Sequence, residues 1–263
     1  MIRTLFLPVL FLVLLLSPSC DLADLDEPIV VSQVEKEFVV SMWEALSPSG
    51  RSFELRVETL KPSDCLNTSI ATQSRRIGPS LRLSLLAIAE PESCDPGSRP
   101  ARAAASYGRL DPGFYELAID LKETIVNEGS MVVFGDRYEL RMNSLKGLEL
   151  EATTLRRVPD GLIWGYFSSD DAQTSTYAAF LDAIGPYVEP VDLLPGEYGY
   201  FSIKEQRKEV VLPEAPETDF LEPFAFRFTG EDTQAFQQVL RDFRAQHAAG
   251  SSLLINTWEG RNW

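Results

Sequence analysis

The chain has 263 residues, a formal net charge of -15, 44% hydrophobic residues and 10% aromatic residues. Nucleic-acid binding needs surplus Lys and Arg that release counterions from phosphates, so this acidic balance argues against a nucleic-acid partner. The apolar share is sufficient for ordinary hydrophobic cores. The length that remains after a leader, about 240 residues, suits two domains better than one.

The first 19 residues have the layout of a secretory signal peptide. Arg3 precedes the apolar run "LFLPVLFLVLLL", and the small or turn-prone residues "SPS" follow at 17–19. The run is too short for a membrane-spanning helix, which needs about 20 residues. We therefore predict that residues 1–19 are a signal peptide and take no part in the fold.

Cys20 follows directly on a small residue and resembles the modified cysteine of bacterial lipoproteins. The usual Leu-Ala-Gly ahead of that cysteine is replaced here by Ser17-Pro18-Ser19, a loosened pattern of the kind found in lipoproteins of the Bacteroidota. The resemblance implies cleavage before Cys20, acylation of this residue and a cell-envelope location, because two or three acyl chains hold a protein firmly at a bilayer. A plain secreted protein is the alternative.

The stretch "DLADLDEP" after Cys20 carries four acids and no base. We interpret residues 20–29 as a solvated acidic tether between the lipid and the folded part. An acidic stretch here also resembles the surface-export signal of Bacteroidota lipoproteins, whereas an aspartate directly after the cysteine resembles the inner-membrane retention signal of enterobacteria. These resemblances imply opposite destinations, periplasm-facing or cell-surface, and the leaflet stays open.

The other two cysteines, Cys65 and Cys94, form an even pair in a chain that is predicted to enter an oxidising compartment. We predict a disulfide between them. In the chain-entropy model, a closed loop of about 30 residues contributes about 3 to 4 kcal/mol. A metal site or a catalytic thiol is the weaker alternative, because there is no C-x-x-C spacing and no nearby histidine.

Residues 30–157 are predicted to form an antiparallel β-sandwich, immunoglobulin-like or prealbumin-like. Apolar residues recur with period two in "SFELRVETL" from Ser52, in "LRLSLLAIA" from Leu81 and in "GFYELAIDL" from Gly113, and turn signals such as "PSG" at 48–50 and "NEGS" at 127–130 separate such runs. The stretch "LDPGFYELAIDL" resembles the Pro-Gly-x-Tyr-x-Leu strand start of many extracellular modules of these two types. One face of each strand must be buried, and a second stacked sheet would bury it.

Residues 158–263 are predicted to form a ferredoxin-like α+β domain. Strand patterns over 162–167, 196–203, 224–230 and 252–258 alternate with helix patterns over 170–185 and 231–250, which gives the order β-α-β-β-α-β. "FSSDDAQ" and "FTGEDTQ" match at both points where a strand leads into a helix, with acids placed to cap the helix N-terminus. This order is typical of the split βαβ arrangement, with both helices on one face of a four-stranded antiparallel sheet.

The sheet of this second domain provides the candidate ligand-binding residues. If one set of alternating residues faces the helices, a set with polar tips faces the other side of the sheet. The helix-facing set is Ile163, Phe167, Phe201, Ile203, Phe224, Phe226, Phe228, Leu253 and Ile255, and the opposite set is Trp164, Tyr166, Tyr198, Tyr200, Arg227, Asn256 and Trp258. Such an aromatic surface could stack sugar rings or peptides. The alternative is a face covered by the first domain or by residues 204–222.

The sequence has little that indicates catalysis. Its single histidine, His247, lies near the end of the last helix pattern, and no nucleophile elbow, Walker loop or metal-ligand cluster is present. Acidic pairs such as Asp170 with Asp171 and Asp219 with Glu222 are explained by helix capping and solubility. We therefore predict no catalytic residues, no metal and no cofactor.

The sequence favours a lipid-anchored envelope protein that binds an envelope protein or glycan without catalysis. The alternatives are an envelope hydrolase with paired carboxylates, which would need two converging acids in a cleft, and a regulator of a neighbouring envelope enzyme. Fold alone does not rank these functions.

Overall fold

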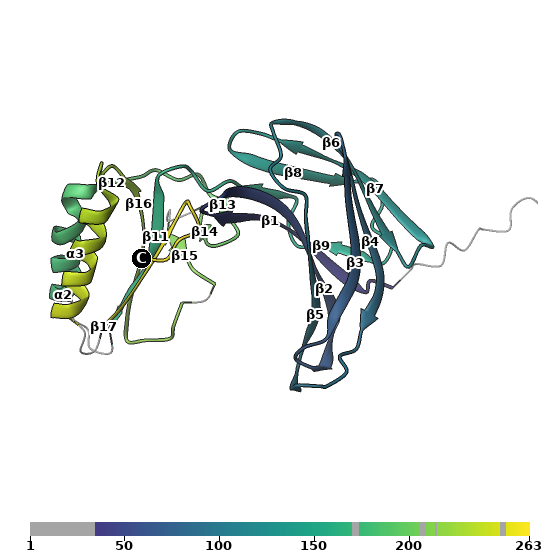
Figure 1. Ribbon diagram of the computed structural model, residues 1–263, viewed down its shortest axis with the longest axis horizontal. Helices are drawn as coiled ribbons and strands as arrows, with labels where there is room; N and C mark the ends of the chain where they lie inside the picture. The colour runs from purple at the N-terminus through teal and green to yellow at the C-terminus, as the bar shows by residue number, and fades with distance from the viewer. Residues whose placement is uncertain (1–34, 170–173, 206–208, 214, 248–250) are drawn as a thin grey trace, which may run out of the picture. The chain divides into compact units, whose positions relative to one another are not determined.

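The computed structural model describes residues 35–169, 174–205, 209–213, 215–247 and 251–263 (Figure 1). The predicted signal peptide, Cys20 and the acidic tether lie outside these residues, and so do Asp170 and Asp171. The described chain is predominantly β, as predicted, and contains few helices. No helix in the described ranges is both long and apolar enough to cross a bilayer.

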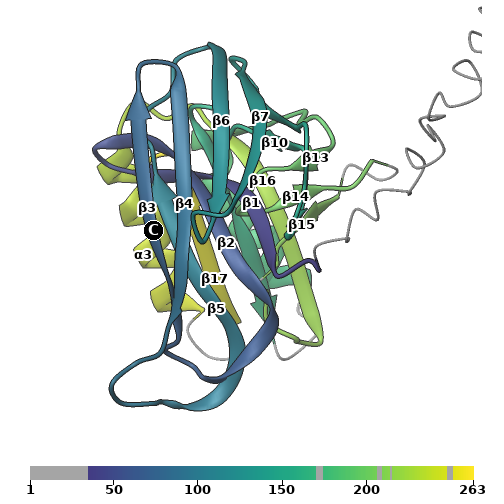
Figure 2. The ribbon, with the colours of Figure 1, turned by 90° about the vertical axis from the view of Figure 1, so that its right-hand side faces the viewer.

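The first half of the described chain forms one large curled sheet (Figures 1 and 2). Its strands lie in the order β10-β8-β7-β6-β4-β3-β5-β2-β1-β9, with parallel pairs β1–β9, β3–β5 and β4–β6 among antiparallel ones. The strands are β1 (Phe38–Ser47), β2 (Gly50–Cys65), β3 (Ser69–Ile77), β4 (Ser80–Ala89), β5 (Pro96–Ser106), β6 (Gly113–Leu121), β7 (Ile125–Val133), β8 (Arg137–Met142), β9 (Leu148–Leu150) and β10 (Thr154–Arg156).

The sheet buries its apolar face by curling, in place of the two stacked sheets expected from the sequence. Strands β9 and β10 stand at opposite ends of the sheet order, yet only residues 151–153 separate them. Within this connection the Glu151 N–H donates to the Val40 carbonyl at 3.0 Å, and the Leu140 N–H donates to the Thr153 carbonyl at 2.8 Å. The two ends of the sheet are thereby brought together. Period-two alternation requires a buried face but does not specify what covers it.

The core inside the curl is made by the residues that the alternation predicts. Phe53, Leu55 and Val57 of β2 are at most 1% exposed, and Leu117 and Ile119 of β6 are at most 3% exposed. Burying one such side chain stabilises the fold by roughly 1.5–3 kcal/mol. All ten strands of the sheet contribute at least one residue to this cluster.

The turn predicted at 127–130 is wrong, because these residues lie inside β7. The chain reverses at Lys122 and Glu123, which have φ angles of 48° and 57°. Neither residue is glycine, so the usual sequence signal of this turn is missing. Asn127 is fully buried and accepts the Lys146 N–H at 2.7 Å, which fixes the loop between β8 and β9.

The predicted disulfide between Cys65 and Cys94 is confirmed, with a Cα–Cα distance of 5.3 Å. It joins the end of β2 to the segment that leads into β5. Strands β2 and β5 are neighbours in the sheet, and the disulfide lies at the end of this pair, where Cys65 is opposite Pro96.

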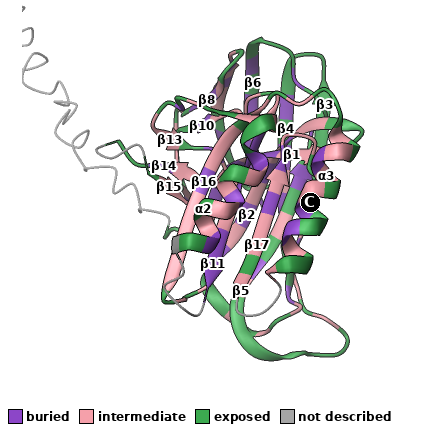
Figure 3. Cartoon of the chain, turned by 90° about the vertical axis from the view of Figure 1, so that its left-hand side faces the viewer, coloured by how far each residue is buried: buried purple, intermediate pink, exposed green. Residues whose placement is uncertain are grey.

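The second half of the described chain contains a four-stranded sheet with two helices on one face (Figure 1). The order β12-β16-β11-β17 is antiparallel at every pair. The outward faces of both helices are exposed (Figure 3). The elements are β11 (Leu162–Ser169), α2 (Thr174–Ile184), the 3-10 turn η2 (Gly185–Tyr187), β12 (Val188–Pro190), β16 (Phe220–Phe228), α3 (Thr233–Gln246) and β17 (Ser251–Thr257).

The stretch 196–203 does not join this sheet, which corrects the sequence prediction. It forms β13 (Gly196–Glu197) and β14 (Ser202–Ile203), which pair with β15 (Val210–Val211) in a separate three-stranded sheet. The short β12 takes the expected place in the four-stranded sheet. Gly199, with a φ of +82°, lies where the expected single strand would have to continue, and only glycine adopts this conformation readily.

Most of the predicted helix-facing set packs against α2 and α3. Seven of its members lie in or against the cluster around Phe180, Phe236 and Phe243, namely Ile163, Phe167, Phe224, Phe226, Phe228, Leu253 and Ile255. Phe201 and Ile203 pack instead on the opposite face, in a cluster with Trp164 and Leu162. Their prediction is wrong because it rested on the misplaced strand.

Candidate binding site

Trp43 and Arg56 come together on the outer face of the curled sheet. In β1 the residues Phe38, Val40 and Met42 point into the core, so Trp43 points outward. The antiparallel register places Ser41 opposite Arg56 on β2. The guanidinium carbon of Arg56 lies 3.6 Å from the centre of the Trp43 ring, which is a close cation–π contact.

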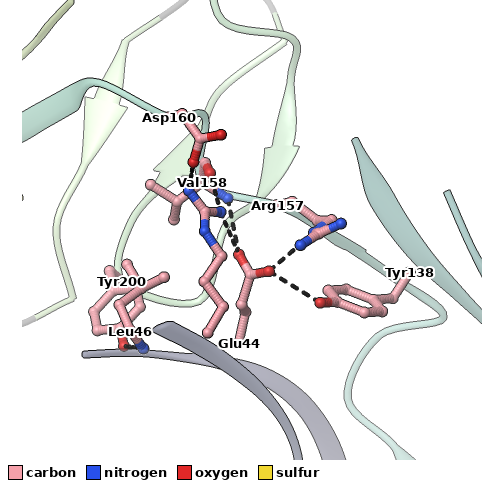
Figure 4. Close-up of polar contacts among 8 residues, drawn as sticks. Glu44, Leu46, Tyr138, Arg157, Val158, Asp160 and Tyr200 are labelled. Atoms are coloured by element: carbon pink, nitrogen blue, oxygen red, sulfur yellow. Dashed lines mark hydrogen bonds and ion pairs between the residues drawn. The ribbon is translucent and has the colours of Figure 1, made fainter. Parts of the chain in front are cut away.

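Tyr200 joins this pair from the loop between β13 and β14. Its ring centre lies 4.6 Å from that of Trp43 and 5.6 Å from that of Trp164. Its hydroxyl accepts the Leu46 N–H at 3.0 Å (Figure 4). A Cβ at Gly199 would lie 3.1 Å from the Trp43 ring, so glycine permits this close approach.

These aromatic residues line a cavity of about 610 Å³, which we call the aromatic cavity. A volume of this size is within the range of small-molecule sites. The lining residues come from β1, β2, β11, β17 and the segments that follow β13, β15 and β17. They include Trp43, Trp164, Tyr166 and Tyr200, together with the polar residues Arg56, Asn256 and Asn262.

Trp164, one of the residues that line this cavity, has a buried donor without a partner among the described residues. Its side chain is 1% exposed, and its indole nitrogen has no hydrogen-bond partner among the described residues. A buried donor without an acceptor costs about 1–3 kcal/mol. Buried polar groups are nearly always hydrogen-bonded, so an unpaired indole N–H calls for a structural or functional explanation.

The structure brings together only part of the predicted ligand-binding set. Trp164, Tyr166, Tyr200 and Asn256 line the aromatic cavity. They do so as walls of a cavity and not as an open sheet face, because Phe201, Ile203 and Leu212 pack over this side of the sheet. The alternative that residues 204–222 help to cover the face is thus supported by the packing of Val210 and Leu212 in this cluster.

Three of the predicted residues lie elsewhere. Tyr198 is 3% exposed, stacks on Phe201 at 4.7 Å and donates its hydroxyl to the Leu194 carbonyl. Arg227 is exposed and lies 3.8 Å from Glu189 across the β12–β16 pair. Trp258 stacks on Phe228 at 6.1 Å and borders a different cavity.

Sequence reasoning did not assign Trp43, Arg56 and Asn262 to the site. The sequence does contain a signal for Trp43 and Arg56. The "SPSG" turn sets the register of β1 and β2, and the alternation of side chains places both residues on the outer face of the sheet. No short-range pattern indicates that Tyr200, far along the chain, meets them. Asn262 reaches the site because it bridges back to Asn256 of β17.

A second cavity of about 400 Å³ shares Trp43, Arg56 and Gly199 with the aromatic cavity. Its lining includes the acids Glu151 and Glu197. Burial raises the pKa of the Glu197 carboxyl, and the nearby charge of Glu151 raises it further. The lining of this cavity therefore holds three acids, Glu58, Glu151 and Glu197, and the pKa of Glu197 is raised.

A buried carboxylate, Glu44, organises the polar contacts at the end of β1 (Figure 4). It accepts hydrogen bonds from the Tyr138 hydroxyl at 2.9 Å, Arg157 Nε at 2.9 Å, Arg51 at 3.1 Å and the Val158 N–H at 3.3 Å. Burial raises the pKa of the Tyr138 phenol, and the charge of Glu44 raises it further. The phenol therefore remains a donor at neutral pH.

His247 lies at the C-cap of α3, in agreement with its predicted position near the helix end. Its backbone N–H donates to the Phe243 carbonyl, and its ring lies 4.6 Å from the ring of Phe243. In the described parts of the chain, no group of three or more His, Cys, Asp or Glu side chains is arranged to hold a metal ion.

Comparison with known proteins gives no relative from which a role could be transferred. No protein-family model, curated protein or solved structure matches this chain.

Proposed function

We propose that the protein is a lipid-anchored cell-envelope protein that binds an envelope glycan or an envelope protein without catalysing a reaction. The aromatic cavity carries this proposal. Trp43, Tyr166 and Tyr200 offer flat apolar rings with polar edges, and Arg56, Asn256 and Asn262 offer hydrogen-bond donors. This combination is typical of binding sites in which a few polar groups orient a ligand.

The attachment to a membrane rests on the lipoprotein-like sequence around Cys20. An anchored protein meets other envelope components at high local concentration, so a moderate affinity in the cavity would be sufficient. Whether the protein faces the periplasm or the cell exterior does not alter the chemistry of the cavity.

For residues 158–263 we propose a ferredoxin-like domain. The order of the four strands in the sheet is second, third, first and fourth by position in the chain, and both helices pack on one face. These features support the assignment. They do not bear on the ligand, because this arrangement hosts many functions.

The proposal is tested by retention of the lipidated full-length protein on isolated envelope material. We expect Trp43→Ala to lower retention about tenfold or more, since one aromatic contact contributes about 1.5 kcal/mol or more when its area is included. Retention is measured by pelleting the washed envelope fraction and immunoblotting the bound protein.

The matched control is Phe114→Ala, which removes an aromatic side chain that is 61% exposed and outside the lining of the aromatic cavity. It should leave retention unchanged. Trp43→Phe, which keeps a ring, should retain most binding. Equal retention of Trp43→Ala and the wild type, with both folded by circular dichroism, would contradict a role of the cavity.

A second candidate is hydrolysis of an envelope polymer by paired carboxylates. The observation that favours it is the raised pKa of Glu197 beside Glu151 in the adjoining cavity, since a general acid needs a proton near neutral pH. Under this candidate Glu197→Gln abolishes release of reducing sugar from envelope polysaccharide and leaves retention intact. If the wild-type protein releases no reducing sugar, the hydrolase candidate is excluded.

A further inference from the structure

The aromatic cavity has one charged residue among the described residues of its lining, and that residue is a cation. The residue is Arg56, in a chain whose formal net charge is -15. The general field of such a chain repels anions. The charge of Arg56 therefore attracts an anionic group only at short range, once that part of a ligand lies beside it in the cavity.

The guanidinium of Arg56 is held in place but is not saturated with hydrogen bonds. Trp43 supports it from one side at 3.6 Å. Its nearest acid is Glu54, with Nε at 3.6 Å from the carboxylate oxygen, which is longer than a hydrogen bond. Among the described residues the guanidinium donates no hydrogen bond, and the side chain is 40% exposed.

A planar guanidinium with free donors matches a carboxylate, because two parallel N–H···O bonds can form at once. The remaining lining consists mainly of aromatic rings with the amides of Asn256 and Asn262. Rings of this kind pack against the apolar face of a sugar, while amides bond to hydroxyl groups. A cavity of about 610 Å³ accepts sugar units, whereas a folded partner could place only a side chain in it.

We infer that the ligand of the aromatic cavity is a glycan that contains a uronic acid, with the sugar among the aromatic rings and its carboxylate paired with Arg56. This inference rests on the proposed function and specifies its ligand class. It also assigns a role to Glu54, which competes with the ligand carboxylate for the same guanidinium.

The test uses the full-length protein in detergent micelles and oligomers of galacturonate, mannuronate and hyaluronan. Each is compared with its carboxyl-reduced form, which keeps the linkages and loses the charge. Binding is followed by tryptophan fluorescence and calorimetry. We expect at least one acidic oligomer to bind about tenfold more tightly than its reduced form, since a charge-assisted hydrogen bond contributes on that scale.

Two variants of β2 separate this inference from a structural role of Arg56. Arg56→Gln should reduce the ratio between the acidic and the reduced oligomer to about one, and Glu54→Gln should tighten binding of the acidic form. Glu116→Gln, an exposed acid on β6, is the charge-matched control and should change neither affinity.

The outcomes distinguish the inference from the proposed function. Equal binding of acidic and reduced oligomers, or a preference that survives Arg56→Gln, overturns the uronic-acid inference while glycan binding stands. If no oligomer binds but envelope retention depends on Trp43, the glycan inference is overturned and a protein ligand remains. If retention does not depend on Trp43, the proposed function itself fails.

Discussion

Glu44 occupies an inward position of β1 that the alternation would otherwise give to an apolar residue. Its carboxylate is fully buried, and two arginines, Arg51 and Arg157, whose side chains are each 17% exposed, neutralise it. Arg51 also donates to the Val158 carbonyl and to Asp160. The network therefore ties β1, β2 and β8 to the segment that leads into β11 (Figure 4).

We expect Glu44→Gln to lower the free energy of unfolding by about 3 kcal/mol, the lower end of the range for removing one partner of a buried ion pair. Glutamine keeps the shape and one acceptor oxygen, but it leaves both arginines without their shared countercharge. The measurement is the urea midpoint of unfolding, followed by circular dichroism and converted with the slope of the transition.

Glu149→Gln is the control for this change. Glu149 pairs with Lys36 at 3.2 Å, and both side chains are about half exposed. An exposed pair of this kind contributes about 0–1 kcal/mol. If the Glu44 variant unfolds at the same urea concentration as the Glu149 variant, the buried ion pairs of Glu44 do not stabilise the fold.

At the scale of elements, β1 has a different role on each face. Its inward residues Val40 and Met42 build the core of the curled sheet, and its outward residue Trp43 supports Arg56 and contacts Tyr200. The N–H of Leu46, near the end of the strand, donates to Tyr200. This strand thus connects the fold to the aromatic cavity directly.

Helix α3 begins at a well-defined N-cap. The side chain of Asp232 accepts the Gln234 N–H at 2.8 Å and the Ala235 N–H at 3.1 Å. The acid also lies at the positive end of the helix dipole. The sequence motif "FTGEDTQ" predicts this helix start, and the structure confirms it.

We expect Asp232→Ala to destabilise the fold by about 1 kcal/mol, because two N–H groups lose their acceptor. Asp232→Asn keeps the capping oxygen and should cost only a few tenths of a kcal/mol, through the dipole. Thermal unfolding of both variants measures the difference. Equal melting temperatures for Ala and Asn would mean that this cap contributes nothing to α3.

At the scale of the whole molecule, the described residues between Glu35 and Trp263 belong to one compact unit. Long-range pairings hold it together, such as the β9–β10 connection that closes the sheet and the disulfide that joins residues 29 apart. The proposed signal peptide and lipid anchor belong to this scale too, since export would bring the chain into an oxidising compartment and the acyl chains would hold it at a membrane.

We expect Cys20→Ser to move the protein from the detergent-rich phase to the aqueous phase in a detergent-partition assay, because the acyl chains provide the membrane attachment. Mass spectrometry of the wild type should show an N-terminus at Cys20 that carries fatty acid. Ser19→Ala, which keeps a small residue before the cysteine, is the control. Recovery of an unacylated wild-type chain would exclude the anchor.

Local rules were sufficient for many elements of this protein. Alternation placed Phe53, Leu55 and Ile119 in the core, strand patterns located β11 and β17 within a few residues, and a helix pattern with a capping signal located α3. These predictions succeed because backbone geometry fixes the period of side chains and the chemistry of helix ends. The cysteine count and the predicted compartment were likewise enough for the disulfide.

The closure of the large sheet, the displacement of 196–203 from the four-stranded sheet and the gathering of Trp43, Arg56 and Tyr200 were decided only in three dimensions. Each depends on which distant segment covers an apolar face or meets an unpaired N–H. A periodic pattern shows that a face must be buried, but the partner follows from packing over the whole chain. The sequence by itself therefore determined most of the secondary-structure elements and provided the prediction of a cell-envelope location. The tertiary structure determined which residues line a cavity where a ligand could bind.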